Sequence, residues 1–371
     1  MTAADVAVKG SDVGELNARL LVMGAGTGAG NNLVASLRAS LPSLTVIGCH
    51  TDPFTLRNST AARTHLLRGG PRAIDEIVRV AQTEAIDLVV PTGDADVTLL
   101  SDHRAVLGRR VYLPSKALID LCQDKCELAT TLARHGVPVP VSLPVTDREQ
   151  VDAVVAKLSW APRLWCRMRA GSRSLGATPV TTAVQAQSWL LLWEQLRGVP
   201  ASAFMLAEYL PGRDFLCQGL WQSGRLLLVK TFERLAYFGG ENSPSGVSSL
   251  SSLAKTIVDD RVVDVCVRAL RALDPQASGA FSIDLKENGE GVPCITEINA
   301  GRFFIGMTAF DHVGVHNMSA CFVRLALGET LAIDEPYDCP PDHYLVRDLD
   351  TPPGVYHADQ ILGGPPQRAR P

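Results

Sequence analysis

Short apolar runs alternate with amphipathic stretches in the first third of the chain. Short apolar runs between turn residues are typical of strands buried on both faces. Strands that alternate with helices favour a parallel sheet. The pattern therefore predicts an α/β domain over residues 19–113 with these four strands: Arg19–Met23, Leu44–Cys49, Ile86–Val90 and Val111–Leu113.

Beyond this domain the pattern becomes a mixture of helices and hairpins. Residues 124–135 have helical spacing, and Gly136 ends them in the manner of a helix C-cap. Two pairs of strand-like runs surround turn residues at 222–224 and 287–291, which predicts two antiparallel hairpins. The fold class is thus α/β followed by α+β.

The two ends of the chain lack these patterns. Residues 1–18 mix charged residues with Gly and Ser, and we expect a flexible N-terminal extension there. Residues 336–371 are rich in Pro and Asp, and we expect an ordered but irregular C-terminal segment.

Composition excludes several function classes. The 371 residues are 46% hydrophobic, which excludes wholesale disorder. The 35 Lys and Arg against 39 Asp and Glu give a net charge of −4, so no nucleic-acid partner is expected. No run approaches the roughly 18 apolar residues of a membrane span, and no signal peptide is apparent. Nine scattered cysteines without a C-x-x-C pair favour free thiols and a cytoplasmic location.

A glycine-rich stretch, Gly24 to Gly30, lies between the first strand and the first helix. It matches a dinucleotide-binding pattern, but the second strand ends in Gly48-Cys49-His50, without the acid that would bind a ribose. A tight structural turn is a second interpretation. We favour a third, in which the loop faces a substrate, together with Thr92–Asp96. The residues expected to contact that substrate are Gly26, Thr27, Gly28 and Asp94.

A second loop, residues 167–176, combines three arginines with glycines and serines. Guanidinium groups and flexible backbone N–H groups suit a polyphosphate, whereas the alternative is a solvated basic turn. Arg167 argues against that alternative, because it closes the apolar run Leu164–Cys166 and so needs an anionic partner.

The second hairpin places acidic side chains on one face. Asp284 lies on its first strand, and Glu297 and Asn299 alternate on the second. Carboxylate and amide oxygens of this kind suit Mg²⁺ that bridges phosphates. Acids on a solvated strand face are the alternative, but the second strand is otherwise apolar, and burying an unpaired carboxylate is costly.

In this order, the motifs resemble the ATP-grasp superfamily, in its carbamoyl-phosphate-synthetase-like and carboxylate–amine ligase branches. The matching segments are Asp124-Lys125 with Gly136-Val-Pro-Val-Pro140, the 167–176 loop, Glu208-Tyr-Leu-Pro-Gly-Arg-Asp214, and the hairpin with Arg302 behind it. The resemblance covers residues 19 to 333. It implies a Rossmann-like pre-ATP-grasp domain at 19–113 and an ATP-grasp domain at 114–335, with a mobile lid at about 137–205.

The resemblance also implies roles for individual residues. Asp284, Glu297 and Asn299 would bind Mg²⁺, with Mn²⁺ as an alternative. Arg302 and Arg167 would act in catalysis, and Arg302 would also contact the substrate. ATP would be held by Lys125, Arg167, Gly171, Ser172, Ser174, Gly176, Glu208, Tyr209, Leu210, Asp214 and Lys230. Three departures stand out: Arg167 replaces a common Lys, Asp284 replaces Glu or Gln, and one extra residue precedes Arg302.

The function that the resemblance implies is an ADP-forming ligase. A carboxylic acid would be activated as an acyl phosphate and attacked by an amine or another nucleophile, and both partners would be small molecules. Three alternatives stay open: a kinase of bicarbonate or carbamate, a non-catalytic ATP sensor, and, more remotely, an NAD-dependent oxidoreductase. A homodimer is an expectation for the assembly.

Overall fold

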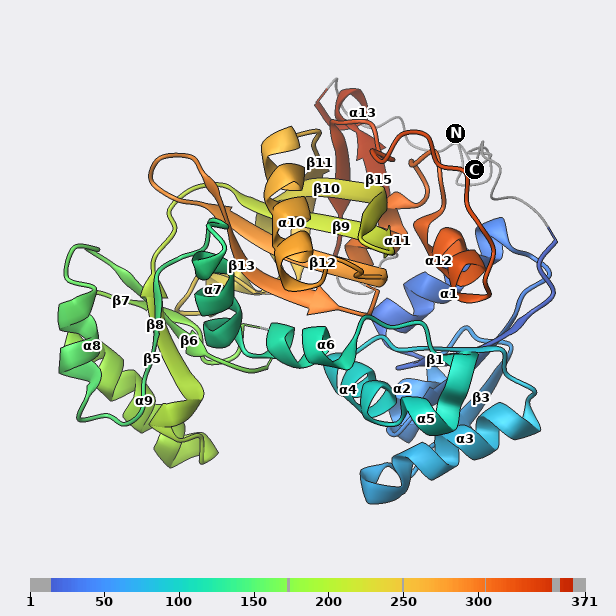
Figure 1. Cartoon of the computed structure of the whole chain (residues 1–371), viewed down its shortest axis with the longest axis horizontal. Helices are drawn as coiled ribbons and strands as arrows, with labels where there is room; N and C mark the ends of the chain where they lie inside the picture. Colours follow the sequence, from blue (N-terminus) through green and yellow to red (C-terminus); the bar gives the residue numbers. More distant parts are fainter. Residues whose placement is uncertain (1–14, 172–173, 249, 304, 349–353, 363–371) are drawn as a thin grey trace.

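The computed structural model describes residues 15–171, 174–248, 250–303, 305–348 and 354–362. These residues form three β-sheets with helices packed against them (Figure 1). None of the helices in these ranges has the length and apolar character that crossing a membrane requires.

The first sheet is parallel and has the strand order β3-β2-β1-β4. Its strands are β1 (Arg19–Met23), β2 (Thr45–His50), β3 (Arg63–Leu66) and β4 (Leu88–Val90). The helices of this region are α1 (Gly28–Ser40), α2 (Pro53–Arg57), α3 (Ala73–Thr83), α4 (Asp94–Asp102) and α5 (Arg104–Leu107). Helix α1 starts inside the glycine-rich stretch, where Thr27 Oγ1 accepts a hydrogen bond from the Gly30 N–H (3.1 Å). The parallel α/β arrangement agrees with the sequence pattern.

The fourth strand of this sheet is not the one that the sequence predicts. Residues 111–113 have no strand structure, and β3 pairs beside β2 instead, with Arg63 opposite Ile47. Strand β3 lies at an edge with mostly exposed side chains, so it has no apolar signature. The apolar character that suggested a strand here has another explanation: Leu113 packs into the core where the chain leaves this sheet.

The central sheet has the order β13-β12-β9-β10-β11-β14-β15, with neighbouring strands antiparallel. Its strands are β9 (Asp214–Gln222), β10 (Arg225–Tyr237), β11 (Ser251–Thr256), β12 (Gly279–Glu287), β13 (Pro293–Ala300), β14 (His343–Val346) and β15 (Gly354–His357). The helices are α10 (Asp260–Leu273), α11 (Ile305–Phe310), α12 (Met318–Ala326) and α13 (Ala358–Leu362). The apolar stripe of α10 contributes Val262, Cys266 and Leu270 to the core over this sheet.

The expectation of an irregular C-terminal segment is wrong for the described residues. Strands β14 and β15 extend the central sheet, and α13 follows them. Strand β11 was also not predicted. These segments are short or carry polar side chains, so their strand character depends on partners that are distant in sequence.

The third sheet forms a separate lobe at the left of Figure 1. Its strands are β5 (Ser142–Pro144), β6 (Leu164–Met168), β7 (Thr178–Val180) and β8 (Phe204–Glu208) in the order β5-β8-β6-β7, with helices α8 (Val151–Lys157) and α9 (Ala183–Arg197). It has a core of its own around Leu190 and Phe204. Helices α6 (Lys116–Gln123) and α7 (Lys125–Arg134) lead from the first sheet to this lobe.

Candidate active site

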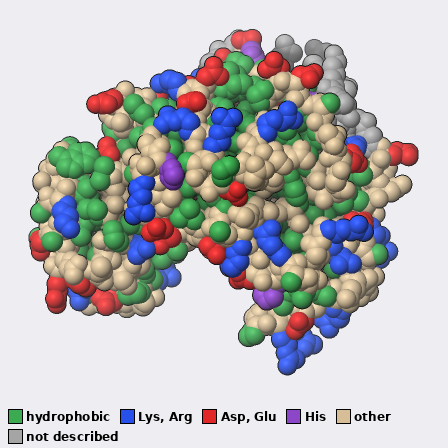
Figure 2. Space-filling view, in the orientation of Figure 1, with side chains coloured by type: hydrophobic (Ala, Val, Ile, Leu, Met, Phe, Trp, Pro, Cys, Tyr) green, Lys and Arg blue, Asp and Glu red, His purple; other side chains and the backbone are tan. Residues whose placement is uncertain are grey.

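A cavity of about 970 Å³ is lined by residues from all three sheets. The surface is hollowed between the lobe of the third sheet and that of the first sheet (Figure 2). Most of the site residues predicted from the sequence line the cavity: Thr27, Gly28, Asp94, Lys125, Arg167, Gly171, Ser174, Glu208, Tyr209, Leu210, Asp214, Asp284, Glu297, Asn299 and Arg302. The fold therefore brings together residues as far apart in the sequence as Thr27 and Arg302, which are 275 positions apart.

Two predicted glycines are buried and are not among the residues that line the cavity. Gly26 has a φ of +88°, and a Cβ there would collide with the Thr55 carbonyl, so this glycine serves the turn rather than a substrate. Gly176 has a φ of +71° and packs against Phe204, where a Cβ would lie 3.0 Å from the ring. Ser172, a third member of the predicted ATP site, lies outside the described residues.

The expectation that Lys230 contacts the nucleotide is wrong. Its side chain is 0% exposed, and its Nζ lies 2.5 Å from Asp311 Oδ1 and 2.9 Å from Asp338 Oδ2. Asp311 also accepts hydrogen bonds from Ser36 Oγ on α1 (2.5 Å) and from the Met318 N–H (2.8 Å). Although burial alone would lower it, the pKa of Lys230 is raised, chiefly because the Asp311 carboxylate lies beside the ammonium group, with Cys339 and Asp338 adding to the effect. The cluster joins α1 to the central sheet.

We expect Lys230→Met to lower the free energy of unfolding by about 3–5 kcal/mol, because it leaves two buried carboxylates without their cation. Urea denaturation measures the change. The matched control is Lys255→Met on the neighbouring strand, whose partly exposed pair with Asp342 (3.5 Å) is worth about 0–1 kcal/mol. If the two substitutions lower the free energy of unfolding equally, the buried cluster does not stabilise the fold more than an exposed ion pair does.

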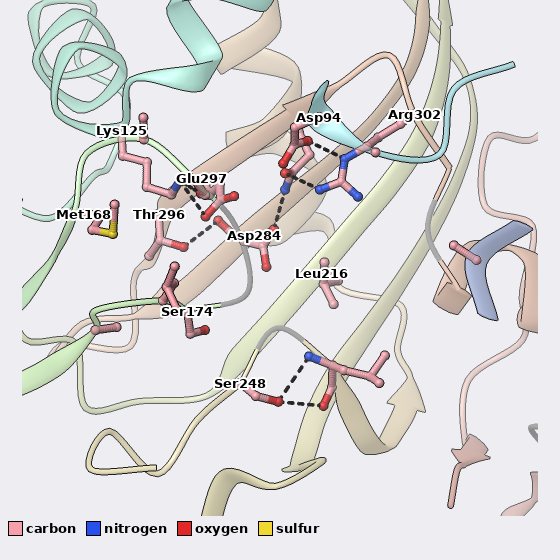
Figure 3. A pocket seen from close by; sticks show the side chains of 18 of the residues that line it. Asp94, Lys125, Met168, Ser174, Leu216, Ser248, Asp284, Thr296, Glu297 and Arg302 are labelled. Carbon is pink, nitrogen blue, oxygen red and sulfur yellow. Dashed lines mark hydrogen bonds and ion pairs between the residues drawn. The ribbon is translucent and has the colours of Figure 1, made fainter. Parts of the chain in front are cut away.

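Two predicted phosphate-binding cations converge on one predicted metal ligand. Lys125 Nζ lies 3.5 Å from Glu297 Oε2, and Arg167 Nη2 lies 3.8 Å from the same oxygen. Lys125 and Glu297 point toward one another in Figure 3. Burial lowers the pKa of both Lys125 and Arg167. Arg167 Nε is buried without a hydrogen-bond partner among the described residues. Buried cations with unused donors suit a polyanion such as a triphosphate.

Helix α7 places Lys125 at its first turn. The Asp124 carboxylate caps this helix by accepting from the N–H groups of Cys126 (3.0 Å) and Glu127 (3.1 Å). The same carboxylate binds Arg169 Nη2 at 2.6 Å, and Lys125 Nζ donates to the Gly171 carbonyl at 2.6 Å. The Asp-Lys pair therefore links helix α7 to the glycine- and arginine-rich loop.

Asp284, Glu297 and Asn299 form the predicted metal-binding set. Asp284 lies directly opposite Glu297 in the β12–β13 register, and Asn299 Nδ2 lies 3.1 Å from Asp284 Oδ2. Within the described residues, no group of three or more His, Cys, Asp or Glu is arranged to hold a metal ion. Mg²⁺ is usually held by one or two carboxylates together with phosphate oxygens and water, so two carboxylates and an amide fit that ion.

Arg234 is a member of the site that sequence analysis missed. Its guanidinium binds Asp214 Oδ1 (2.5 Å) and Asp284 Oδ1 (2.9 Å), and Asp214 also accepts a hydrogen bond from the Tyr237 hydroxyl. Burial, the largest influence, raises the pKa of Asp284 to about 6 even though Arg234 opposes it. The sequence feature that could have revealed Arg234 is its spacing. It follows the buried Phe232 by two residues and so lies on the same face of β10.

Arg302 connects the first sheet's region to the metal-binding set. Its Nε lies 2.5 Å from Asp94 Oδ1 at the start of α4, and its Nη2 donates to Asn299 Oδ1 at 3.2 Å. Figure 3 shows Asp94 and Arg302 pointing toward one another beside Asp284. The extra residue before Arg302 thus leaves the guanidinium within reach of the site.

Residues 208–210 line the cavity where strand β8 ends. The Glu208 N–H donates to the Val141 carbonyl (2.9 Å), and the Tyr209 ring lies 5.0 Å beneath the Arg163 guanidinium. Leu210 is buried. The segment offers an apolar surface and a strand end, as a purine site requires.

Comparison with solved structures of known proteins identifies the fold. No protein-family model matches the chain. An L-amino acid ligase from Bacillus licheniformis is 16% identical, with a TM-score of 0.66 over 90% of this chain and 79% of that chain. The biotin carboxylase domain of Hydrogenobacter thermophilus 2-oxoglutarate carboxylase is 12% identical, with a TM-score of 0.69 over 90% and 74%. A carboxyaminoimidazole ribonucleotide synthase from Aspergillus clavatus is 14% identical, with a TM-score of 0.66 over 89% and 82%. The chain has the ATP-grasp fold, as the order of its motifs predicts.

Proposed function

We propose that this chain is an ATP- and Mg²⁺-dependent, ADP-forming ligase that activates a carboxylic acid as an acyl phosphate. The observation that carries the proposal is the convergence of Lys125, Arg167 and Glu297 in one cavity, with Asp284 opposite Glu297. The Hydrogenobacter structure contains MgADP and bicarbonate, and the Aspergillus structure contains ATP, which supports a nucleotide in the equivalent fold.

Positioning of the reactants and neutralisation of phosphate charge would account for most of the rate acceleration. Lys125, Arg167 and Ser174 with Gly171 would hold the phosphates, residues 208–210 the adenine, and Asp214 the ribose. Asp284, Glu297 and Asn299 would bind Mg²⁺, which neutralises charge on the β- and γ-phosphates when bound. Arg302 would stabilise negative charge as the acid's oxygen attacks the γ-phosphorus and ADP leaves.

In the second half of the reaction a nucleophile attacks the acyl carbon and expels phosphate. An amine is the nucleophile that we propose, because an L-amino acid ligase shares this fold. Thr27, Gly28 and Asp94 line the part of the cavity that belongs to the first sheet, and we assign the acceptor acid to that part.

The remote oxidoreductase alternative finds no support in the glycine-rich turn. Asp52, the acid nearest the end of β2, caps α2 by accepting from the N–H groups of Phe54 (3.0 Å) and Thr55 (3.3 Å). A carboxylate engaged in this way is not free to bind the ribose of a dinucleotide.

We expect ADP release from Mg·ATP to depend on an added carboxylic acid, and on an amine for full turnover. A coupled assay for ADP and phosphate, run over a panel of acids and amines, measures it, and excess EDTA should abolish the signal. Turnover with bicarbonate alone would support the carbamate-type kinase instead. Tight ATP binding without turnover in any pairing would support the sensor and contradict the proposal.

A further inference from the structure

Arg347 differs from the other cations of the cavity. Every other Lys or Arg of the described lining lies within 4.0 Å of a carboxylate: Lys125, Arg167, Arg234, Lys286 and Arg302. Among the described residues, Arg347 has no carboxylate partner. Burial lowers the pKa of Arg347 to about 10, and no neighbouring charge offsets this effect.

Most hydrogen-bond donors of Arg347 are unused by the described residues. Its Nη1 donates to the Ser251 carbonyl at 3.1 Å, whereas its Nε is buried without a partner. Its backbone N–H donates to the Ser252 carbonyl (2.9 Å), which fixes the end of β14 against β11. A guanidinium carries five N–H donors in a planar fork that matches a carboxylate. The fixed backbone presents that fork at the cavity wall.

The strand register puts Arg347 on the same face of the central sheet as the metal-binding set. Leu345 on β14 lies opposite Ala254 on β11, which lies opposite Arg234 on β10. Alternate residues of a strand share a face, so Arg347 shares the face of Arg234, whose guanidinium binds Asp284. Strands β14 and β12 are separated by four strand spacings, or about 19 Å along the sheet. Arg347 is therefore remote from the place of phosphoryl transfer.

The cavity wall between these two places carries a charged pair beside apolar residues. Asp214 lies opposite Arg234 in the β9–β10 register, on the face that Arg347 shares, and between the level of Asp284 and the end of β14. Leu216 and Phe232 line the same cavity and belong to one buried cluster. A ligand that reaches from the metal-binding set to Arg347 would thus have a charged group at each end and would pass a carboxylate and a guanidinium that already bind each other.

We propose that Arg347 binds a carboxylate at the end of an organic substrate that is remote from the reacting carbon. The proposal rests on the ligase function above and narrows its substrate class. The carboxylate belongs either to a dicarboxylic acid or to an amino acid nucleophile whose amine and carboxylate are separated by a chain of several carbons. A single guanidinium without a second unpaired cation matches a singly charged carboxylate better than a doubly charged phosphate ester.

The test compares substrates that differ only in this group. Dicarboxylic acids are paired with their monoamides, and amino acids with their carboxamides, in the ADP-release assay. Arg347→Met is expected to raise KM about 10- to 100-fold for the member with the remote carboxylate, and to leave KM for the amide and for ATP within twofold. Arg347→Lys should fall between, because it keeps the charge but loses the fork. The control is Lys255→Met, which removes a cation from the opposite face of the same sheet.

The two sources of carboxylate give different results. An effect confined to dicarboxylic acids assigns Arg347 to the activated acid, and an effect confined to amino acids assigns it to the nucleophile. Unchanged KM values in Arg347→Met, with turnover intact, would overturn this inference and leave the ligase function standing.

A binding measurement separates the inference from the ligase function. Calorimetric titration of the same acids and amino acids into the protein with a non-hydrolysable ATP analogue and Mg²⁺ needs no turnover. Binding that depends on the remote carboxylate and is lost in Arg347→Met supports the inference even where turnover fails. Absence of carboxylate-dependent binding to the unsubstituted protein across the panel would overturn it.

Discussion

Replacing Glu297 with glutamine is expected to lower turnover by at least about 1000-fold while the fold persists. The substitution keeps the size of the side chain and removes one of the two charges that would bind Mg²⁺. It also leaves Lys125 and Arg167 without the carboxylate that lies 3.5 Å and 3.8 Å from them. Steady-state ADP release at saturating ATP measures the loss.

Nucleotide affinity should change in the opposite direction when the metal is absent. Glu297 is a negative charge beside the cations that would hold phosphates, so its removal reduces repulsion of a metal-free triphosphate. We expect Glu297→Gln to bind ATP in EDTA at least as tightly as the unsubstituted protein. Loss of both binding and turnover would instead indicate a damaged fold.

The matched control is Glu287→Gln on the same hairpin. Glu287 binds Arg213 (2.7 Å) and Arg261 (3.5 Å) and does not line the cavity. Its substitution should leave kcat within a few-fold of the unsubstituted value and act on stability alone. Full activity in Glu297→Gln would remove the metal assignment, because the site would then work with a single carboxylate.

The sequence was informative where local chemistry carries the signal. Alternation along two strands separated by a turn was enough to place Asp284 and Glu297 on one face, and the register puts them directly opposite each other. The capping residue Asp124 and the following Lys125 likewise stand next to each other in the chain. Such features need only the periodicity of a strand or helix and a short turn.

Ion pairs between residues that are distant in sequence could not be predicted from the sequence. Arg234 was not recognised as a site residue, because its partners Asp214 and Asp284 come from other strands. Lys230 is four residues earlier on β10, yet its carboxylates come from Asp311, just after α11, and from Asp338 in the C-terminal segment. Strand β14, with Arg347 just after it, is four residues long and lies near the sheet edge, where polar and exposed side chains are tolerated.

Arg302→Met is expected to lower kcat by about 100- to 1000-fold and to leave the affinity for Mg·ATP within about threefold. Its guanidinium contacts Asn299 and Asp94, so it lies between the metal-binding set and the part of the cavity assigned to the acceptor acid. A cation there stabilises charge that develops during phosphoryl transfer more than charge in the ground state. Single-turnover ADP formation separates this effect from product release.

Asp94→Asn distinguishes this role from a purely structural one. The Asp94 side chain is 39% exposed, so its ion pair with Arg302 is worth about 0–1 kcal/mol. We therefore expect Asp94→Asn to lower kcat less than about tenfold, because the guanidinium remains. Were the pair needed only to join the first sheet to β13, both substitutions would lower kcat and the free energy of unfolding to the same extent. A large loss of kcat in Arg302→Met alone, at unchanged stability, is the result that assigns the guanidinium to the reaction.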